Sequence, residues 1–429
     1  MPAPNSFDYT DFLAREQLRK LTNKLVISEA FNTSYNKNFT KSFATGAVVR
    51  VPYPVQFLPG TQNDLGYEPQ TIIDRATDVR INRMAKVHFG YDVLQRALES
   101  RHFEEALTTD IIEPAVNTMA QDIEDNCAKW AYQHAGTVVG VLGTNPTTFD
   151  QVFGAARQRL VNLGAGTGKR MMILGTNIAR PLIAASLPLF APLGEIERAF
   201  KEGAIGRAQG FDTYESASLY SHTSGAWAGI VEILAAPTAP ADLGTGITAL
   251  SITATNGDTL LPGDKFSIAA VFEVNNNTRR STGRLRDFTY TGTTTITAAA
   301  NVMPIPSFSP PMFGPGSPYQ NVSALPLAGA DLALWPGTNA SGVAATAKTG
   351  VISLALPKDA FALVGVKLSL PPTGGDFKSS QKRDPTSGLA VSFVQQFDAK
   401  TMEWVTRFDC PYGFGDFYSG NAVAVAAGV

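Results

Sequence analysis

Residues 164–169, Gly-Ala-Gly-Thr-Gly-Lys, come closer than any other stretch of this chain to a nucleotide-binding motif. A phosphate-binding loop has the pattern G-x-x-x-x-G-K followed by Ser or Thr, whose hydroxyl binds Mg²⁺. Here Leu163 stands at the first glycine position, and Arg170 follows the lysine. The stretch also runs from a predicted helix to a predicted strand, the reverse of the usual order. We therefore predict a helix-to-strand turn and no nucleotide site.

Histidine, cysteine and acidic residues show no spacing that would build a metal centre or a catalytic triad. The four histidines are scattered, and neither H-E-x-x-H, C-x-x-C nor G-x-S-x-G occurs. Asp122, Glu124 and Asp125 form an acidic cluster that is typical of the solvent face of a helix. The two cysteines, Cys127 and Cys410, cannot form a disulfide framework. We predict that the chain is not an enzyme and uses no cofactor or metal.

The composition is that of a large globular chain with little surface charge. The 429 residues suggest two to four domains, and the formal net charge is −2 with only 17% charged residues. No segment is basic enough to wrap nucleic acid by counterion release. No run of 18 apolar residues occurs, and the N-terminus lacks the pattern of a secretory signal, so we expect neither a membrane span nor secretion.

The longest predicted element is a helix over residues 110–135. Its apolar residues recur at helical spacing: Ile112, Val116, Met119, Ile123, Cys127 and Trp130. Pro114 would lie in or near the first turn, and Gly136 would end the helix as a C′ glycine. From this stretch alone, a core helix of a large enzyme is the leading interpretation.

Two further elements, a terminal helix and a two-stranded arm, are predicted before this helix. An amphipathic helix over residues 10–26, with Phe12 and Leu18 on its apolar side, is predicted at the N-terminus. Strands at 46–54 and 77–91, joined by a stretch rich in turn formers, predict a long two-stranded arm. An isolated hairpin is marginal in water, so the arm must lie on its own body or on another chain. Its cations have few acidic neighbours in the arm: Arg75, Arg80, Arg83 and Lys86.

The rest of the chain alternates between two kinds of sequence pattern, one of helices with buried strands and one of short strands alone. Helices and buried strands over residues 143–237 predict an α/β domain. From residue 238 short strands rich in Thr, Ile and Val, broken by turn residues, predict a separate β-barrel or sandwich up to residue 346. After residue 346 the sequence pattern of the α/β domain returns. The β-domain is therefore inserted into the α/β domain, and the last strands of the chain should close the body that precedes the insertion.

Three blocks resemble the major capsid proteins of tailed bacteriophages, which share the Johnson fold. They are residues 202–215 (EGAIGRAQGFDTYE), 263–266 (GDKF) and 357–362 (PKDAFA), and the branch that they resemble is the coat protein of short-tailed Salmonella phages. The resemblance implies an α+β fold whose parts are an N-terminal arm (1–45), an extended β-hairpin loop (46–85), a peripheral domain with a long spine helix (86–142 and 376–429), an axial α/β domain (143–237 and 347–375) and an inserted β-barrel (238–346).

The same resemblance implies a function in assembly. The chain would form hexamers and pentamers of an icosahedral shell around a scaffolding protein, in the host bacterial cytoplasm. Double-stranded DNA would enter through a portal without sequence-specific contact, and the sequence leaves open whether a decoration protein binds the shell. Candidate subunit-interface residues are Phe12, Leu18, Arg75, Arg80, Arg83, Lys86, Arg279, Arg280 and Arg284, and candidate lumen-facing residues are Glu124 and Asp125. The alternatives are an α/β enzyme with a β-insert and a phage tail or receptor-binding protein.

Overall fold

The structure is a computed structural model that describes residues 18–21, 25–34, 48–53, 55–57, 72–73, 75–92, 113–165, 168–186, 206–334, 345–368, 370, 377–384, 388–400 and 402–428. The chain divides into two compact units, each built from separate segments. Unit 1 comprises residues 1–51, 78–127 and 362–415, and unit 2 comprises residues 52–77, 128–361 and 416–429. Phe12, the tip of the arm (58–71) and the stretch 93–112 lie outside the described residues.

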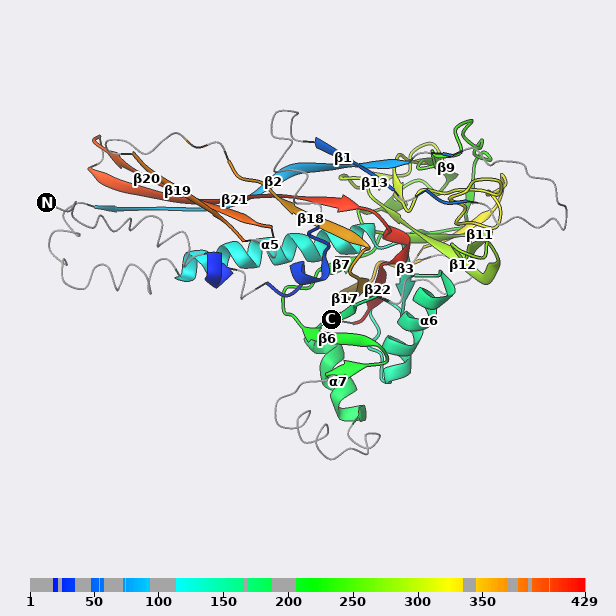
Figure 1. Ribbon diagram of the computed structural model, residues 1–429. Helices are drawn as coiled ribbons and strands as arrows, with labels where there is room; N and C mark the ends of the chain where they lie inside the picture. The colour runs from blue at the N-terminus through cyan, green and yellow to red at the C-terminus, as the bar shows by residue number, and fades with distance from the viewer. Residues whose placement is uncertain are drawn as a thin grey trace, which may run out of the picture. The chain divides into compact units, whose positions relative to one another are not determined.

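Unit 1 is organised around a long antiparallel sheet and the first part of helix α5 (Glu113–His134). The sheet has the order β1-β2-β21-β20-β19, and β18 also pairs with β21. Figure 1 shows α5 running along the long strands β2 and β21. The strand bounds are Val48–Pro52 (β1), Ala76–Asp92 (β2), Phe361–Gly365 (β18), Phe377–Arg383 (β19), Ala390–Asp398 (β20) and Glu403–Asp416 (β21).

The alternation predicted for β2 is confirmed. Arg80, Asn82, Lys86 and His88 are exposed, whereas Val79 and Ala85 are buried. β2 pairs with β21 from Arg80 to Asp92, so a strand near the start of the chain is joined to one near its end. This pairing confirms that the last strands close the earlier body.

Helix α5 confirms the predicted long helix, with Pro114 in its first turn. Met119, Ile123 and Cys127 are at most 2% exposed. The prediction for Gly136 was wrong, because its φ is not among the positive values found for other glycines. A Cβ at this position would lie 2.5 Å from Cδ of Pro310, so close packing explains the glycine there.

Unit 2 contains an α/β sheet of mixed direction. Its order is β3-β22-β17-β4-β6-β5, with β7 also paired to β17. The pairs β3–β22 and β4–β6 are parallel, and β17 is antiparallel to both β22 and β4. The strands are Thr137–Val139 (β3), Arg170–Leu174 (β4), Arg207–Ala208 (β5), Phe211–Glu215 (β6), Ser221–Thr223 (β7), Thr349–Pro357 (β17) and Val423–Ala426 (β22).

Helices pack against this sheet and share its core. The segment predicted as one helix after residue 147 consists of a π-helical turn, Asp150–Gly154 (η4), followed by α6, Ala155–Asn162. Phe153 and Leu160, together with Leu182 of α7 (Thr176–Ser186), are fully buried against Met172 and Val425. Of the stretch at 164–169, the described residues 164–165 and 168–169 lie between α6 and β4, the helix-to-strand order that was predicted. Two short 3-10 helices lie elsewhere, Ser28–Ala30 (η1) in unit 1 and Ser419–Asn421 (η5) in unit 2.

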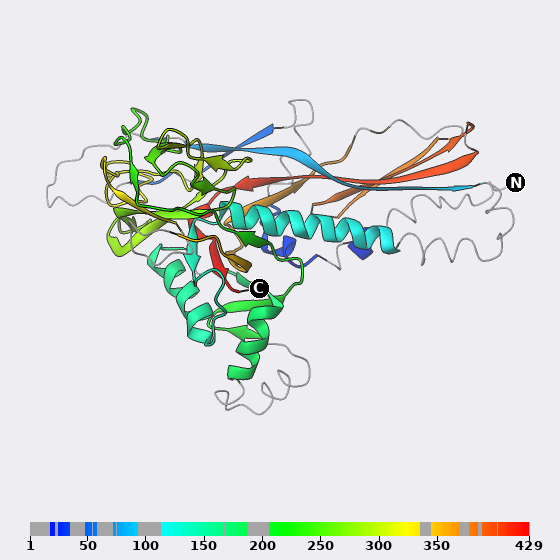
Figure 2. The ribbon, with the colours of Figure 1, turned by 180° about the vertical axis from the view of Figure 1, so that it is seen from behind.

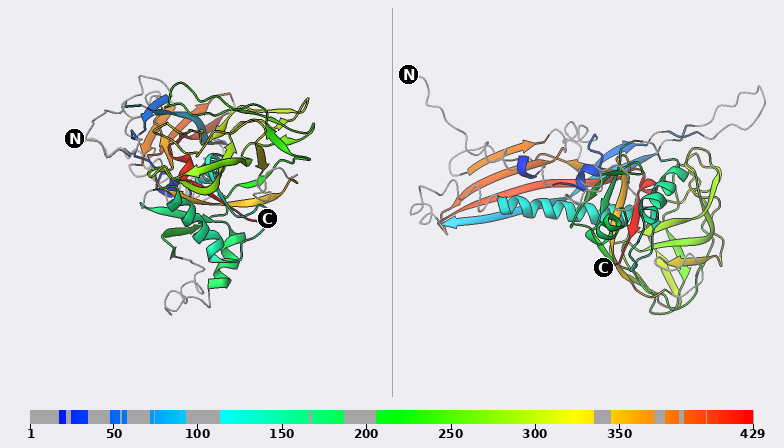
Figure 3. Two further views of the ribbon diagram at one scale, coloured as in Figure 1. Left: turned by 90° about the vertical axis from the view of Figure 1, so that its right-hand side faces the viewer. Right: turned by 90° about the horizontal axis from the view of Figure 1, so that it is seen from below.

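The remaining strands of unit 2 form an all-β body. A seven-stranded sheet has the order β14-β9-β8-β16-β11-β12-β15, and β10 pairs separately with β13. Its terminal strands β14 and β15 are consecutive in the chain, so the sheet curls back on itself as a near-closed barrel (Figures 2 and 3). The bounds are Val231–Ile233 (β8), Leu250–Thr253 (β9), Thr259–Leu260 (β10), Lys265–Val274 (β11), Ser281–Tyr290 (β12), Ile296–Thr297 (β13), Val302–Ile305 (β14), Phe308–Ser309 (β15) and Asp331–Leu334 (β16).

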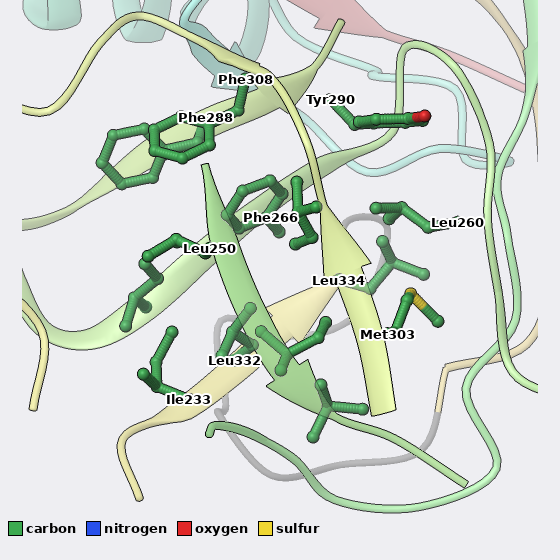
Figure 4. Close-up of a cluster of buried hydrophobic side chains, with 14 of the residues drawn as sticks. Ile233, Leu250, Leu260, Phe266, Phe288, Tyr290, Met303, Phe308, Leu332 and Leu334 are labelled. Carbon is green, nitrogen blue, oxygen red and sulfur yellow. The ribbon is translucent and has the colours of Figure 1, made fainter. Parts of the chain in front are cut away.

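The barrel has its own hydrophobic core (Figure 4). Phe266, Phe288 and Phe308 meet at its centre with ring centroids 5.3–6.0 Å apart, mostly in edge-to-face or tilted arrangements. Strand β8 precedes residue 238, the predicted start of the β-domain. After the barrel, β17 pairs with β4, so the chain returns to the α/β sheet that it left.

Candidate assembly surfaces

The exposed face of strand β2 carries a row of cationic side chains. Arg80, Lys86 and His88 alternate with residues that face the other side of the sheet. In the neighbouring strand β21, Arg407 lies opposite His88, and its Nε donates to Asp409 at 2.8 Å. Arg80 and Lys86 make no ion pair with a described residue. This face is therefore available to acidic groups that the unit itself does not supply.

Arg83 lies on the opposite face of the same strand and is used within unit 1. Its Nη1 donates to Oδ1 of Asn126 on α5, and its guanidinium lies 5.4 Å from the ring centre of Phe414. The arginine thus ties the sheet to the helix that packs on it. Of the predicted arm cations, Arg80 and Lys86 point outward, and Arg83 has partners inside its own unit.

Arg75, at the base of the arm, lies in unit 2 against three aromatic rings. Its guanidinium carbon is 4.2 Å from the ring centre of Tyr53, 4.8 Å from that of Phe313 and 5.6 Å from that of Tyr319. Stacking on the ring faces stabilises the cation without using its N–H groups. The base of the arm is fixed further because the hydroxyl of Tyr319 donates to the carbonyl of Ile73 at 2.9 Å.

The predicted arginines of the barrel divide into two kinds. Arg279, at a turn with φ of 57°, donates to the carbonyls of Gln320 and Pro318 and to Oε1 of Gln56. It therefore has several partners within unit 2. Arg280 and Arg284 are exposed, and they remain candidates for contacts with other subunits.

The prediction that Glu124 faces a lumen was wrong. Its side chain is 4% exposed and accepts backbone N–H bonds from Ile27 at 2.6 Å and Ser28 at 3.0 Å. Burial raises the pKa of this carboxyl, and the hydrogen bonds lower it. Ile27 and Ser28 of the N-terminal segment cover this side of α5. The buried face of the helix is therefore wider than the predicted apolar stripe. Asp125 is exposed, as the prediction requires. Leu18 is half-buried in a short helical segment, residues 18–21.

The block Gly263-Asp264-Lys265-Phe266 builds a buried polar cluster in unit 2. Asp264 is 0% exposed and accepts bonds from Nε2 of His222 at 2.8 Å and from the N–H groups of Gly225 at 3.0 Å and Leu261 at 2.6 Å. Gly263 has a φ of +95°, and a Cβ there would lie 2.9 Å from the ring of Tyr132. The glycine is therefore required both for the turn and for space.

Lys265 closes the C-terminus of α5. Its Nζ donates to the carbonyls of Tyr132 at 3.0 Å and Ala135 at 2.6 Å, and to the hydroxyl of Thr289 at 2.7 Å. The terminal carbonyls of a helix have no partners within it and carry partial negative charge, so a cation is favourable here. Because the ammonium is 1% exposed, burial lowers the pKa of Lys265 to about 7.

A second buried ionic group joins α6 to the barrel. Arg159, 2% exposed, lies 3.4 Å from a carboxylate oxygen of Glu273 and also pairs with Asp287. Asp287 in turn accepts the N–H of Val138 at 3.2 Å. A buried arginine needs its partners, because removal of one leaves an uncompensated charge.

Sequence reasoning missed the roles of Arg159, Asp264 and Lys265. A signal was present in the Asp-Lys pair, which stands between a turn glycine and a strand whose residues are mostly apolar. Charged residues at the start of a buried strand indicate internal partners. The identity of those partners, in α5 and before β8, depends on contacts distant in sequence.

The described residues contain no group of three side chains suited to a metal ion. In the same part of the chain, no helix has the length and apolarity needed to cross a membrane. Burial raises the pKa of both cysteine thiols, Cys127 and Cys410, so neither has the low pKa of a reactive cysteine.

Comparisons with known proteins point to viral coats. A family model described as P22 coat protein, gene protein 5, matches residues 3–421. No curated protein matches the chain. Among solved structures, one titled Mycobacterium phage Che8 is 12% identical, covers 94% of this chain and 90% of its own, and has a TM-score of 0.46. The capsid of the cyanophage P-SCSP1u is 12% identical, with coverage of 89% and 84% and a TM-score of 0.42.

The family match spans both units, including the barrel and strand β21. It confirms the predicted α+β capsid fold with its inserted barrel, and the prediction that the chain is a structural protein and not an enzyme. Over nearly its whole length, the chain belongs to the P22 coat protein family, the subunits of a viral shell.

Proposed function

We propose that this coat protein builds an icosahedral shell of hexamers and pentamers that encloses packaged double-stranded DNA. The match of residues 3–421 to a coat protein family carries this proposal. Assembly takes place in the host bacterial cytoplasm around a scaffolding protein, and DNA enters through a portal. Within the subunit, the proposed division remains N-terminal arm, extended loop, peripheral domain, axial domain and inserted barrel, with the bounds given above.

The charge distribution supports a container that releases its contents. The formal net charge of −2 gives no strong attraction for phosphates over the whole subunit. The cationic row on β2, with Arg80 and Lys86, is instead suited to acidic groups of a neighbouring subunit. Screened surface charges of this kind direct association more than they stabilise the product, so they affect the rate and accuracy of assembly.

The experiment is assembly of the purified chain, alone and with the proposed scaffolding protein. Light scattering follows growth, and negative-stain electron microscopy identifies the products. We expect closed shells of uniform diameter in the presence of scaffold. A protein that remains a small discrete oligomer under all these conditions would contradict the proposal.

A matched pair of variants tests the cationic row. Arg80→Glu with Lys86→Glu reverses two exposed charges of β2, and Lys378→Glu with Lys400→Glu reverses two exposed charges elsewhere in unit 1. We expect normal folding of both, slower or aberrant assembly of the first, and ordinary shells from the second. Equal assembly of both variants would remove the β2 face from the proposed interface.

A further inference from the structure

A pocket of about 70 Å³ opens on the surface of unit 2. One water needs roughly 10–15 Å³ of such space, so the pocket accommodates a group with several heavy atoms. Two arginines, Arg75 and Arg286, line it together with aromatic rings, prolines and amide side chains. The pocket therefore places two permanently charged side chains next to aromatic and proline side chains.

Arg286 is the more deeply placed of the two cations. The residue is 2% exposed, and its Nε has no hydrogen-bond partner. The guanidinium packs so closely on the backbone of Gly420 that a Cβ there would clash with Nη2. Burial lowers the pKa of this arginine, which reflects the cost of holding an unpaired cation away from water.

The carboxylates nearest to Arg286 are engaged elsewhere. Glu273 and Asp287 both pair with Arg159. Arg284 adds a further cation that interacts electrostatically with the same two acids. Three arginines thus share two carboxylates, which leaves positive charge in excess beside the pocket. Asp416 precedes the lining residue Phe417 in the chain and accepts a hydrogen bond from the hydroxyl of Ser309 at 3.2 Å.

Arg75 is the second cation that lines the pocket. Its guanidinium carbon lies over two aromatic rings, at 4.2 Å from the ring centre of Tyr53 and 4.8 Å from that of Phe313. No described residue forms an ion pair with it. A guanidinium that stacks by its face keeps its in-plane N–H groups for an acceptor, and their fork matches the two oxygens of a carboxylate.

The polar neighbours in the wall are already bonded to one another. The hydroxyl of Tyr53 donates to the carbonyl of Asp416 at 2.8 Å, and Nδ2 of Asn321 donates to that of Pro311 at 2.7 Å. Gln56 accepts from Arg279 at 2.9 Å. These bonds fix the wall, whereas Nε of Arg286 has no hydrogen-bond partner and Arg75 has no ion-pair partner among the described residues.

We propose that this pocket is a carboxylate-binding site, filled in the shell by an acidic side chain from a second copy of the chain. The preference for a carboxylate follows from two unpaired guanidinium forks and a pocket of small volume. The source rests on the proposed shell function, because assembly brings identical copies together and each copy carries 37 Asp and Glu residues. Binding of the anion itself does not depend on assembly.

The first experiment uses the unassembled full-length subunit and sodium acetate as the probe. Thermal unfolding is measured against acetate concentration, with chloride replacing acetate at constant ionic strength. We expect acetate to raise the midpoint above that in chloride, and titration calorimetry to give one site per chain. Equal midpoints in the two salts, with no calorimetric site, would overturn the proposal. Inorganic phosphate in the same assay distinguishes a general oxyanion site from one that prefers a planar carboxylate.

Variants locate the site. Arg75→Gln and Arg286→Gln each remove one fork, and each should weaken acetate binding by about tenfold or more. Arg75→Lys keeps the charge and loses the fork, so it should also bind more weakly. Arg157→Gln, at an exposed arginine of the same unit, should bind acetate as the unaltered chain does. Undiminished binding in folded Arg75→Gln and Arg286→Gln subunits would place the anion elsewhere.

The second experiment identifies the source of the carboxylate in assembled shells. A filled pocket predicts that shells no longer bind acetate and that a reconstruction shows an acidic side chain of a neighbouring copy against Arg75 or Arg286. Shells whose pockets still bind acetate as free subunits do would refute the second copy as the ligand. Because both outcomes require shells to form, this failure is distinct from a failure of the proposed function.

Discussion

Replacing Lys265 with methionine tests the role of the buried ammonium at the end of α5. Methionine is unbranched and apolar, so it fills the space of the lysine stem without charge. Three hydrogen bonds are lost, to the carbonyls of Tyr132 and Ala135 and to Thr289. Both carbonyls keep one other donor: the N–H of Ala135 reaches Tyr132 at 3.3 Å, and the hydroxyl of Thr289 reaches Ala135 at 2.8 Å.

The pH dependence separates the loss of these bonds from the cost of the buried charge. The pKa of Lys265 is about 7 in the folded chain and about 10.5 when unfolded. Between these values the unfolded chain binds more protons, so the free energy of unfolding rises with pH. The rise begins near pH 7, and by pH 9 it amounts to about 2–3 kcal/mol, at 1.36 kcal/mol per pH unit.

The Lys265→Met chain lacks this contribution. It should be destabilised little at pH 6 and by about 2–3 kcal/mol more at pH 9, relative to the unaltered chain. Urea unfolding of the unassembled subunit at pH 6, 7, 8 and 9 measures the difference. Lys348→Met, at an exposed lysine of the same unit, is the control and should follow the unaltered chain at every pH. Parallel curves for Lys265→Met and the unaltered chain would refute a lowered pKa at Lys265.

Three further predictions concern α5 and the arm. Glu124→Ala frees two buried backbone N–H groups and should lower the free energy of unfolding by about 2–4 kcal/mol in urea, whereas Glu124→Gln, which keeps an acceptor oxygen, should cost less. Asp125→Lys should leave shell closure intact and alter DNA retention in filled particles; unchanged retention in a gel assay would remove its lumen-facing role. Replacing residues 58–71 with a short Gly-Ser linker should give a folded subunit, by circular dichroism, that does not close shells, and normal shells would exclude an assembly role for the arm.

The periodic elements of this protein were predictable from local sequence. Helix α5 and strand β2 follow directly from apolar spacings of 3.6 and 2 residues, and each buries the face that its pattern indicates. The barrel was predictable from composition, because short runs of β-branched residues between turn formers leave few other folds. Its exact start was less accessible, since β8 has only three residues and no distinctive pattern.

The buried polar groups of the protein were harder to predict from the sequence. Glu124 and Asp125 are neighbours of the same charge, yet one is buried by the N-terminal segment and the other is exposed. Within the helix, Glu124 lies one turn from the buried residues Ala120 and Ala128, whereas Asp125 lies one turn from the exposed residues Gln121 and Lys129. The segment whose backbone binds Glu124 lies almost 100 residues earlier, so the helix sequence does not identify it. The partners of Lys265 and Arg159 depend in the same way on contacts between residues that are distant in sequence.

A reconstruction of the assembled particle with icosahedral symmetry imposed is the sharpest test of the proposed shell function. We expect a closed shell in which this chain occupies both hexamers and pentamers. The exposed cations Arg80 and Lys86 of β2 should lie against acidic side chains of a neighbouring copy. A particle that lacks this chain in its wall, or a chain found only as a discrete small oligomer, would contradict it.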